Sequence, residues 1–249
     1  MSAQRSDILA RKDQILRTAI DQYITTVTPV SSARIAQKCS LDLSSATIRN
    51  ILAELEREGY LTHPHTSAGR VPTQVGYRYY VDNFINEIQI LEEEKKRIKE
   101  EYHRETFKLE ALLDKTSRVL SNLTHYTSII SMDGWDNKIF YSGTSFITGY
   151  PDYHDVNKDI AKIKNILSVL DEKEQLLEVI NRTLAKKIDV LIGQEMECSD
   201  IEGCSLVVSQ YTSRQGASGR IAVLGPTRMD YSRVVSALEY LSDLMEEVL

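Results

Sequence analysis

Residues 43–80 read LSSATIRNILAELEREGYLTHPHTSAGRVPTQVGYRYY, and this stretch decides the predicted fold. Ser44 is a good N-cap for a helix that runs to about Glu58, and Gly59 suits the position just past its end. Apolar residues recur at helical spacing and predict one buried face for this helix. They are Ile48, Ile51, Leu52 and Leu55.

The opposite face of this helix is polar near its start. Its outward residues are Ser45, Thr47, Arg49, Asn50 and Ala53. Arginine can bind guanine and asparagine can bind adenine through paired hydrogen bonds in the major groove, and hydroxyl groups suit phosphates. The pattern therefore fits a DNA recognition helix, and it fits an ordinary solvated helix face equally well.

A turn-rich segment follows the helix. Residues 60–62 are a short strand candidate, and residues 63–73 form a hairpin-like loop that we interpret as a wing. We expect Arg70 near its tip to meet phosphate or the minor groove, with Gly69 allowing close backbone approach. His63 and His65 lack a nearby acidic or thiol partner, so we favour structural or phosphate-facing histidines over metal ligands.

The segment before this stretch is also helical. Residues 6–26 carry one apolar stripe, and Thr28–Val30 ends that helix. Ser31 then caps a short helix over residues 32–38, whose Ile35 and Ala36 point inward, and residues 39–42 make a tight connection. A longer helix followed by two short ones is the helix-turn-helix arrangement.

After the wing, Thr73 caps the next helix. Helical periodicity then persists from Phe84 to Leu123, interrupted by Lys95, Glu105 and Thr116. We favour one long helix that links the domains and serves as a dimerisation arm. A surface helix or a helical hairpin remains an alternative.

The last half alternates between strands and helices. Strands are expected at 126–132, 138–141, 189–193, 204–211 and 219–224, the last two as a hairpin, with a loop at 143–153. Helices are expected at 155–170, 172–185 and 230–249. The predicted fold class is therefore α+β, with domains at residues 1–80, 81–124 and 125–249.

Composition limits the function classes. The net charge is −6, yet residues 1–80 hold ten Lys/Arg against seven Asp/Glu, which gives +3. A mildly basic head on an acidic body is compatible with DNA binding by the head alone. Three cysteines without a CxxC pair, no signal sequence and no long apolar run lead us to expect a cytoplasmic protein with no membrane association.

Enzyme signatures are missing. The sequence holds no phosphate-binding loop, no HExxH and no GxSxG, and Asp152, Asp155 and Asp159 look like the acids common at a helix start. We expect no enzymatic activity, no cofactor and no metal.

Several strings resemble a known family. ATIRN, GYL, PHTSAGR-x-PT and GYRYYVD resemble the N-terminal signature of the heat-inducible transcription repressor family HrcA. GTS at 143–145 and LGPTRMDYSRVV at 224–235 resemble its C-terminal signature. The resemblance covers roughly residues 8–128 and 140–248.

This resemblance implies a winged helix and a GAF-like domain. It implies a homodimer on an inverted-repeat operator in double-stranded DNA upstream of chaperone operons, kept folded and active by the GroEL-type chaperonin and failing on heat stress. The implied DNA contacts are Ser44, Ser45, Thr47, Arg49 and Asn50, with His65, Ser67, Gly69 and Arg70 on the wing.

The chain departs from the family pattern in two places. Ser45 stands where the family commonly has proline, which is pre-organised at a helix start. Only seven residues, 131–137, bridge a region where the family carries a long segment with an inserted domain. We therefore expect a reduced GAF-like domain.

Three functions follow from this reading. The first is a dimeric heat-shock repressor. The alternative is a regulatory or scaffolding protein that works through its acidic body and has a vestigial DNA-binding head. The third is a repressor that senses a small molecule, although no polar constellation in the sequence points to a ligand.

Overall fold

A computed structural model describes residues 2–38, 43–64, 69–85, 92–103, 109–135, 138–150, 156–181, 187–214 and 216–249. The chain divides into two compact units, residues 1–85 and 86–249, where the sequence led us to expect three regions. Among the described residues, no helix combines the length and the apolar character needed to cross a membrane.

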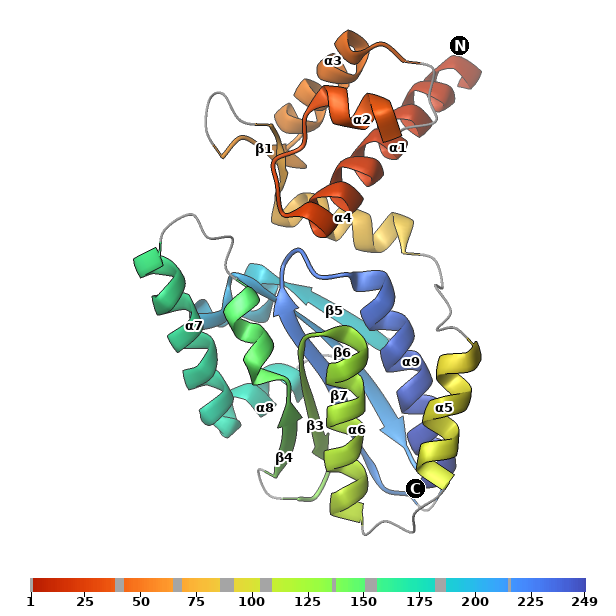
Figure 1. Cartoon of the computed structure of the whole chain (residues 1–249), viewed down its shortest axis with the longest axis vertical. Coiled ribbons are helices and arrows are strands. Elements are labelled where there is room, and N and C mark those ends of the chain that lie inside the picture. The colour runs from red at the N-terminus through yellow and green to blue at the C-terminus, as the bar shows by residue number, and fades with distance from the viewer. Residues whose placement is uncertain are drawn as a thin grey trace. The chain divides into compact units, whose positions relative to one another are not determined.

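The N-terminal unit is a winged helix-turn-helix (Figure 1). Helices α1 (Ser2–Thr26), α2 (Ser32–Lys38) and α3 (Ser45–Arg57) precede a hairpin of β1 (Leu61–Thr62) and β2 (Val71–Pro72), and α4 (Gln74–Phe84) follows. The three predicted helices are confirmed. Their apolar stripes meet in one core that includes Ile15, Leu16, Ile20, Ile35, Ile48, Leu52, Leu55 and Leu61.

Local capping fixes the ends of α3. The Ser44 hydroxyl accepts a hydrogen bond from the backbone N–H of Thr47 at 3.1 Å and so satisfies one of the free donors at the helix start. Gly59 follows the C-cap with φ +83°, the left-handed conformation that glycine adopts without strain. Both predicted ends of this helix are therefore confirmed.

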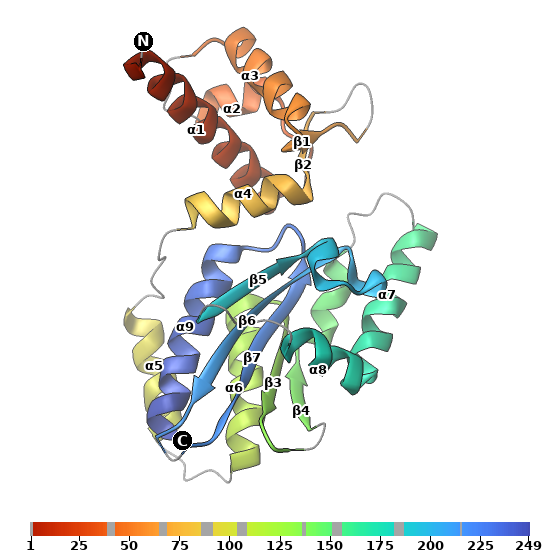
Figure 2. The same ribbon diagram turned by 180° about the vertical axis from the view of Figure 1, so that it is seen from behind.

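The predicted long helix from Phe84 to Leu123 is wrong. Helix α4 ends at Phe84, where Ile85 takes extended backbone angles, and two further helices follow, α5 (Glu92–His103) and α6 (Leu109–Thr124). Figures 1 and 2 show α5 and α6 running in opposite directions, which is the helical hairpin alternative.

Helix α6 has a buried face of its own. Leu112, Leu113 and Leu120 are buried within the C-terminal unit, so this helix packs as a layer of that domain. Thr116 interrupted the apolar spacing in the sequence, and it is buried too. Its burial is tolerated because its hydroxyl donates a hydrogen bond to the backbone carbonyl of Leu112 at 2.9 Å.

The C-terminal unit is built on a five-stranded antiparallel sheet of order β4-β3-β7-β6-β5. Its strands are β3 (Thr127–Met132), β4 (Ile139–Ser142), β5 (Ile188–Ile192), β6 (Cys204–Thr212) and β7 (Ser218–Pro226). The five predicted strands are confirmed, as is the β6–β7 hairpin.

Helices cover both faces of this sheet (Figures 1 and 2). Helices α6 and α9 (Tyr231–Val248) lie on one face, and α7 (Val156–Asp171) and α8 (Lys173–Asn181) lie on the other. Short 3-10 turns occupy Thr144–Gly149, Gly193–Met196 and Ser199–Ile201. The result is the α+β, GAF-like architecture that was predicted.

Small hydroxyl residues fill the layer between α6 and the sheet. The Ser128 hydroxyl donates to the Ser117 carbonyl at 2.5 Å, and the hydroxyls of Ser117 and Ser142 lie 3.0 Å apart. All these groups are satisfied inside the protein, as buried polar atoms must be. Serine therefore allows the helix to approach the strands closely without leaving unpaired hydroxyls.

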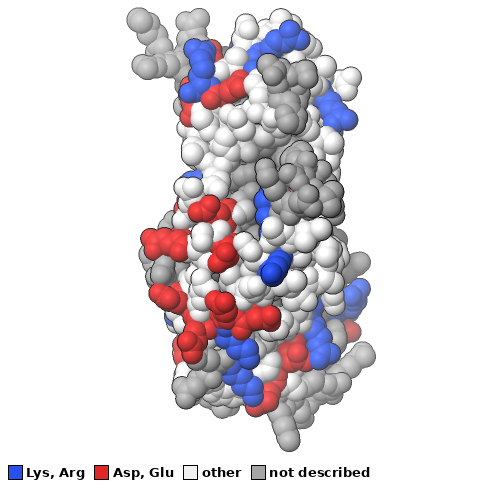
Figure 3. Space-filling model, turned by 90° about the vertical axis from the view of Figure 1, so that its left-hand side faces the viewer, with Lys and Arg blue, Asp and Glu red and all other residues white. Residues whose placement is uncertain are grey.

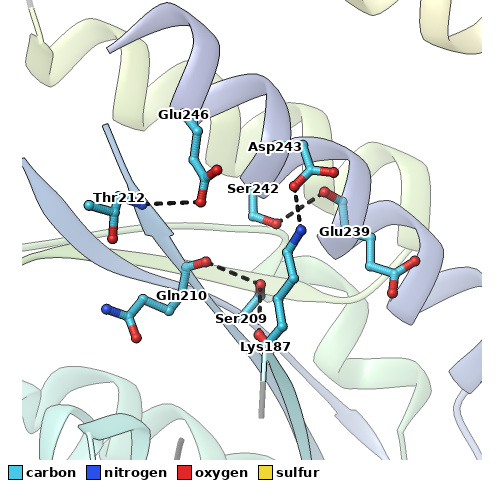
Figure 4. Close-up of polar contacts among 8 residues, drawn as sticks. All are labelled: Lys187, Ser209, Gln210, Thr212, Glu239, Ser242, Asp243 and Glu246. Atoms are coloured by element: carbon cyan, nitrogen blue, oxygen red, sulfur yellow. Dashed lines mark hydrogen bonds and ion pairs between the residues drawn. The ribbon is translucent and has the colours of Figure 1, made fainter. Parts of the chain in front are cut away.

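The C-terminal half of α9 is tied to the sheet by polar contacts (Figure 4). The Glu246 carboxylate accepts from the Thr212 backbone N–H at 3.4 Å, and the Lys187 ammonium donates to Asp243 at 2.5 Å. That hydrogen bond is the main reason that the pKa of Lys187 is raised. These bonds fix the end of the helix over β5 and β6.

Candidate nucleic-acid interface

The leading end of α3 presents a polar surface. Ser45, Thr47, Arg49 and Asn50 are exposed, whereas Ile48 on the same turn is fully buried. The arrangement follows from the 3.6-residue period, because one helix face packs on α1 and α2 while the other faces solvent. The sequence placed these four residues on the outward face, and the structure has them there.

Ser44 and Thr47 are joined at the start of this helix. Their hydroxyl oxygens lie 2.9 Å apart, in addition to the capping bond to the Thr47 amide. One hydroxyl must donate to the other, so part of their hydrogen-bonding capacity is used internally. Arg49 and Asn50 lie one turn further along with exposed side chains that carry the donors and acceptors suited to base edges.

Arg70 anchors the wing to the rest of the N-terminal unit. The backbone N–H and carbonyl of Arg70 pair with those of Val30 at 2.9 and 2.8 Å, directly before Val71 begins β2 on the loop side of the hairpin. Its contact with phosphate or the minor groove stays a prediction. Its guanidinium Nη2 lies 3.1 Å from Glu56 Oε2, and Nε donates to the same oxygen at 3.2 Å. His63 Nε2 approaches the other Glu56 oxygen at 3.3 Å.

Two glycines allow backbone segments to pack closely beside the wing. A Cβ on Gly69 would lie 2.6 Å from the Val30 carbonyl oxygen, and a Cβ on Gly76 would overlap the carbonyl of Tyr60. The close approach that we expected of Gly69 is therefore made to the protein's own backbone. His65 and Ser67, the other predicted wing contacts, lie outside the described residues.

Residues at the start of α4 bind the backbone on the other side of the wing hairpin. The Thr73 hydroxyl caps the helix by accepting from the Gly76 N–H at 3.1 Å, which confirms the predicted cap. Its one hydrogen is donated to the Gly59 carbonyl at 2.5 Å, and the Tyr60 carbonyl lies 3.2 Å away. Tyr79 donates to Asp13 of α1 at 2.9 Å. Much of the PT-x-x-GYRYY string therefore positions the wing, and the exposed residues of α3 carry the surface chemistry.

Sequence reasoning missed the cations beside α3. Arg34 and Lys38 on α2 are exposed, and so is Arg57 near the end of α3. Arg34 donates to the Thr28 hydroxyl at 2.9 Å, which orients its guanidinium. Positive charge was the only signal that these residues offered, and it does not distinguish a phosphate contact from a solvated side chain.

The residues of the C-terminal signature, at 143–145 and 224–235, hold neighbouring elements of the C-terminal unit together. Asp230 caps α9 by accepting from the Arg233 N–H at 3.1 Å, and Arg228 donates to the Gly149 carbonyl at 2.7 Å. Gly143 has φ +83°, and a Cβ there would overlap the Ser121 hydroxyl of α6. These residues join β7, α9 and the turn after β4, and they are not arranged as a catalytic site.

A winged helix-turn-helix with an exposed polar recognition helix, joined in one chain to a GAF-like sheet, defines the class of winged-helix transcription regulators. Comparison with known proteins gives the family. The chain is 30% identical to the heat-inducible transcription repressor HrcA of Desulforudis audaxviator over 96% of the chain and 97% of the relative, and it belongs to the HrcA family. This is a family of transcription repressors and not of enzymes.

Further matches agree with this assignment. The HrcA of Carboxydothermus hydrogenoformans is 28% identical over 96% of the chain and 97% of the relative. A family model described as the HrcA protein C terminal domain matches residues 132–235. A crystal structure of a hypothetical protein at 2.2 Å resolution superposes with a TM-score of 0.72 over 96% of this chain and 97% of that one, at 19% identity, and supports the fold.

The relatives are longer inside the aligned region. The alignment with the D. audaxviator repressor extends over 338 positions, whereas the chain has 249 residues, so at least 89 positions (338 minus 249) have no counterpart here. In this chain only residues 133–138 connect β3 to β4, and the described part of this connection includes Gly134 at φ +78°.

Proposed function

We propose that this protein is a DNA-binding repressor that acts as a homodimer in the cytoplasm. It binds an inverted-repeat operator upstream of chaperone operons and loses repression on heat stress. The observation that carries the proposal is the exposed Arg49–Asn50 end of α3 in a winged helix-turn-helix unit, in a chain that belongs to the HrcA family.

The mechanism begins with α3 entering the major groove. Arg49 and Asn50 read base edges there, while Ser45, Thr47 and the N-terminal amides of the helix lie against phosphates. Arg34 and Lys38 add phosphate contacts from α2. Most of the binding free energy then comes from charge neutralisation, so affinity falls steeply as salt rises.

The wing contributes through its orientation. Glu56 belongs to α3 and binds Arg70 where the wing loop enters β2, so this ion pair holds the wing against the helix. His65 and Ser67 remain our candidates for direct wing contacts. Gly69 and Arg70 act mainly by holding the hairpin in place.

Dimerisation is part of the proposed mechanism. An inverted repeat offers two half-sites related by a twofold axis, so two heads must be held at a fixed spacing. Because α6 is packed within the C-terminal unit, we assign pairing to the surface of that unit, including α5. The resemblance to the family implies that the GroEL-type chaperonin keeps the repressor folded and active, and we propose the same partner here.

The test is a binding titration with a fluorescent duplex that carries the inverted repeat of a chaperone promoter. We expect two chains per duplex, an affinity that falls with salt, and weaker binding to a scrambled duplex of equal length. Adding chaperonin should increase the fraction of active repressor after mild heating. Equal binding to both duplexes, or none to either by a folded protein, would contradict the proposal.

A scaffolding role is the second candidate, and one observation favours it. Acidic side chains gather over the C-terminal unit on the face drawn in Figure 3, and residues 81–249 hold twenty Lys/Arg against twenty-nine Asp/Glu. Such a surface repels DNA and suits a basic protein partner. Loss of binding to every duplex with the fold intact would support this role.

A further inference from the structure

The C-terminal unit contains a small cavity where β6 begins and β7 ends. Its volume is about 140 Å³, and the buried side chains of Ile166, Ile201 and Cys204 form an apolar part of its lining, which we call the floor. An apolar cavity of about 150 Å³ can hold a benzene-sized molecule. The space therefore fits a small organic body of about six non-hydrogen atoms.

The rim of the cavity is charged. Lys162 of α7 and Arg228 after β7 supply two cations, and Asp200 supplies one carboxylate. The Arg228 guanidinium is fixed there, because Nη2 donates to the carbonyls of Gly149 and Tyr150 at 2.7 and 3.3 Å. Among the residues that the structure describes there, the cavity is lined by two cations and one carboxylate beside its apolar side chains.

Lys162 is the cation of α7 that lines the cavity among the described residues. It forms no ion pair with any carboxylate of the described residues, yet its charge is close enough to Cys204 to oppose the rise in pKa that burial causes in that thiol. Both Lys162 and Lys164, two residues further along, are exposed, and only Lys162 lines the cavity. The Lys162 ammonium is therefore placed to meet a negative group at the mouth.

We propose that this cavity is a binding site for a small organic carboxylate with a short apolar body. The carboxylate would lie between Lys162 and Arg228, and the apolar part would fill the floor over Ile201 and Cys204. A plain carboxylic acid and a free α-amino acid share this chemistry, and Asp200 distinguishes them, because it would attract an α-ammonium group and repel a second anion.

The test uses the full chain with no DNA, so its outcome is separate from that of the repressor proposal. Isovalerate is titrated while the backbone amides of Gly203 and Thr227, which line the cavity, are followed by ¹H–¹⁵N NMR. Isovaleramide has nearly the same shape without the charge and is the matched ligand control. We expect saturable shifts at these two amides with isovalerate and much weaker ones with isovaleramide.

Two matched variants test the assignment of the charge. Lys162→Gln should weaken isovalerate binding about tenfold, while Lys164→Gln on the same helix should leave it unchanged. Leucine is the second ligand: Asp200→Asn should weaken leucine if the site prefers amino acids, and should strengthen isovalerate if it prefers plain acids. Shifts that do not saturate, or an equal effect of the two lysine variants, would overturn the site.

Discussion

The ion pair between Glu56 and Arg70 allows the role of the wing to be tested against simple electrostatics. Glu56→Gln removes one negative charge from the recognition helix and keeps the shape of the side chain. If phosphate attraction alone decided affinity, this change would tighten DNA binding. If Glu56 orients the wing through Arg70, the same change should weaken it.

The magnitude follows from the geometry of the pair. The Arg70 and Glu56 side chains are only 15% and 30% exposed, and two guanidinium nitrogens contact one carboxylate oxygen at 3.1 and 3.2 Å. A partly buried pair with this geometry exceeds the ~0.2–1 kcal/mol of exposed ion pairs, so we assign it about 1–2 kcal/mol of unfolding free energy. A misplaced wing should lower DNA affinity by about three- to tenfold.

Two assays measure these effects. Urea unfolding gives the stability of Glu56→Gln, Arg70→Ala and the double variant, and the coupling between the two sites should be about 1 kcal/mol. Fluorescence anisotropy with the operator duplex gives the affinities. Glu54→Gln is the matched control, since Glu54 is exposed on the same helix and its loss changes the charge equally. If Glu56→Gln tightens binding as Glu54→Gln does, the positioning role is refuted.

Other changes probe the remaining parts of the account. Arg49→Ala should cost about 1–3 kcal/mol of DNA binding and relax the base preference at one position, measured over duplexes with single substitutions, whereas a uniform loss would mean a phosphate contact. Ser44→Ala should lower the unfolding free energy by about 1 kcal/mol, and no change in urea midpoint would contradict its capping role. Gly76→Ala should cost about 3 kcal/mol or more, because the added methyl overlaps the Tyr60 carbonyl; a native spectrum with unchanged stability would argue against this contact. Burial raises the pKa of Cys204 from 9.0 to about 12, so its contribution to stability is complete below pH 9 and is lost as pH rises toward 12. Iodoacetamide should therefore label it at pH 8 only after unfolding, and rapid labelling of the native protein would contradict its burial.

The features predicted correctly are those that depend on neighbouring residues in the sequence. Ser44, Gly59 and Thr73 act within one turn of the helix that they begin or end, so their roles could be predicted from local spacing. The same holds for the buried face of α3 and for the alternation in the strands. The outward placement of Arg49 and Asn50 followed directly from that buried face.

The errors concern partners that are distant in the sequence. Helical spacing is preserved through a helical hairpin, so the pattern between Phe84 and Leu123 could not distinguish one long helix from α5 and α6. The sequence also did not reveal the contacts of Arg70, because Val30 and Glu56 are 40 and 14 residues away and no local signal connects them. The cavity near Lys162 likewise forms only when α7, β6 and β7 come together.

The most direct test of the central claim is a hydroxyl-radical footprint of the full chain on a chaperone promoter, with wild type compared with an Arg49→Ala, Asn50→Ala double variant. We predict two protected half-sites related by twofold symmetry, with centres about one helical turn (~34–36 Å) or a multiple of it apart. The double variant should lose this pattern while its fold, measured by circular dichroism, stays intact. Protection at a single site, or an unchanged footprint in the double variant, would contradict DNA reading by α3 in a dimer.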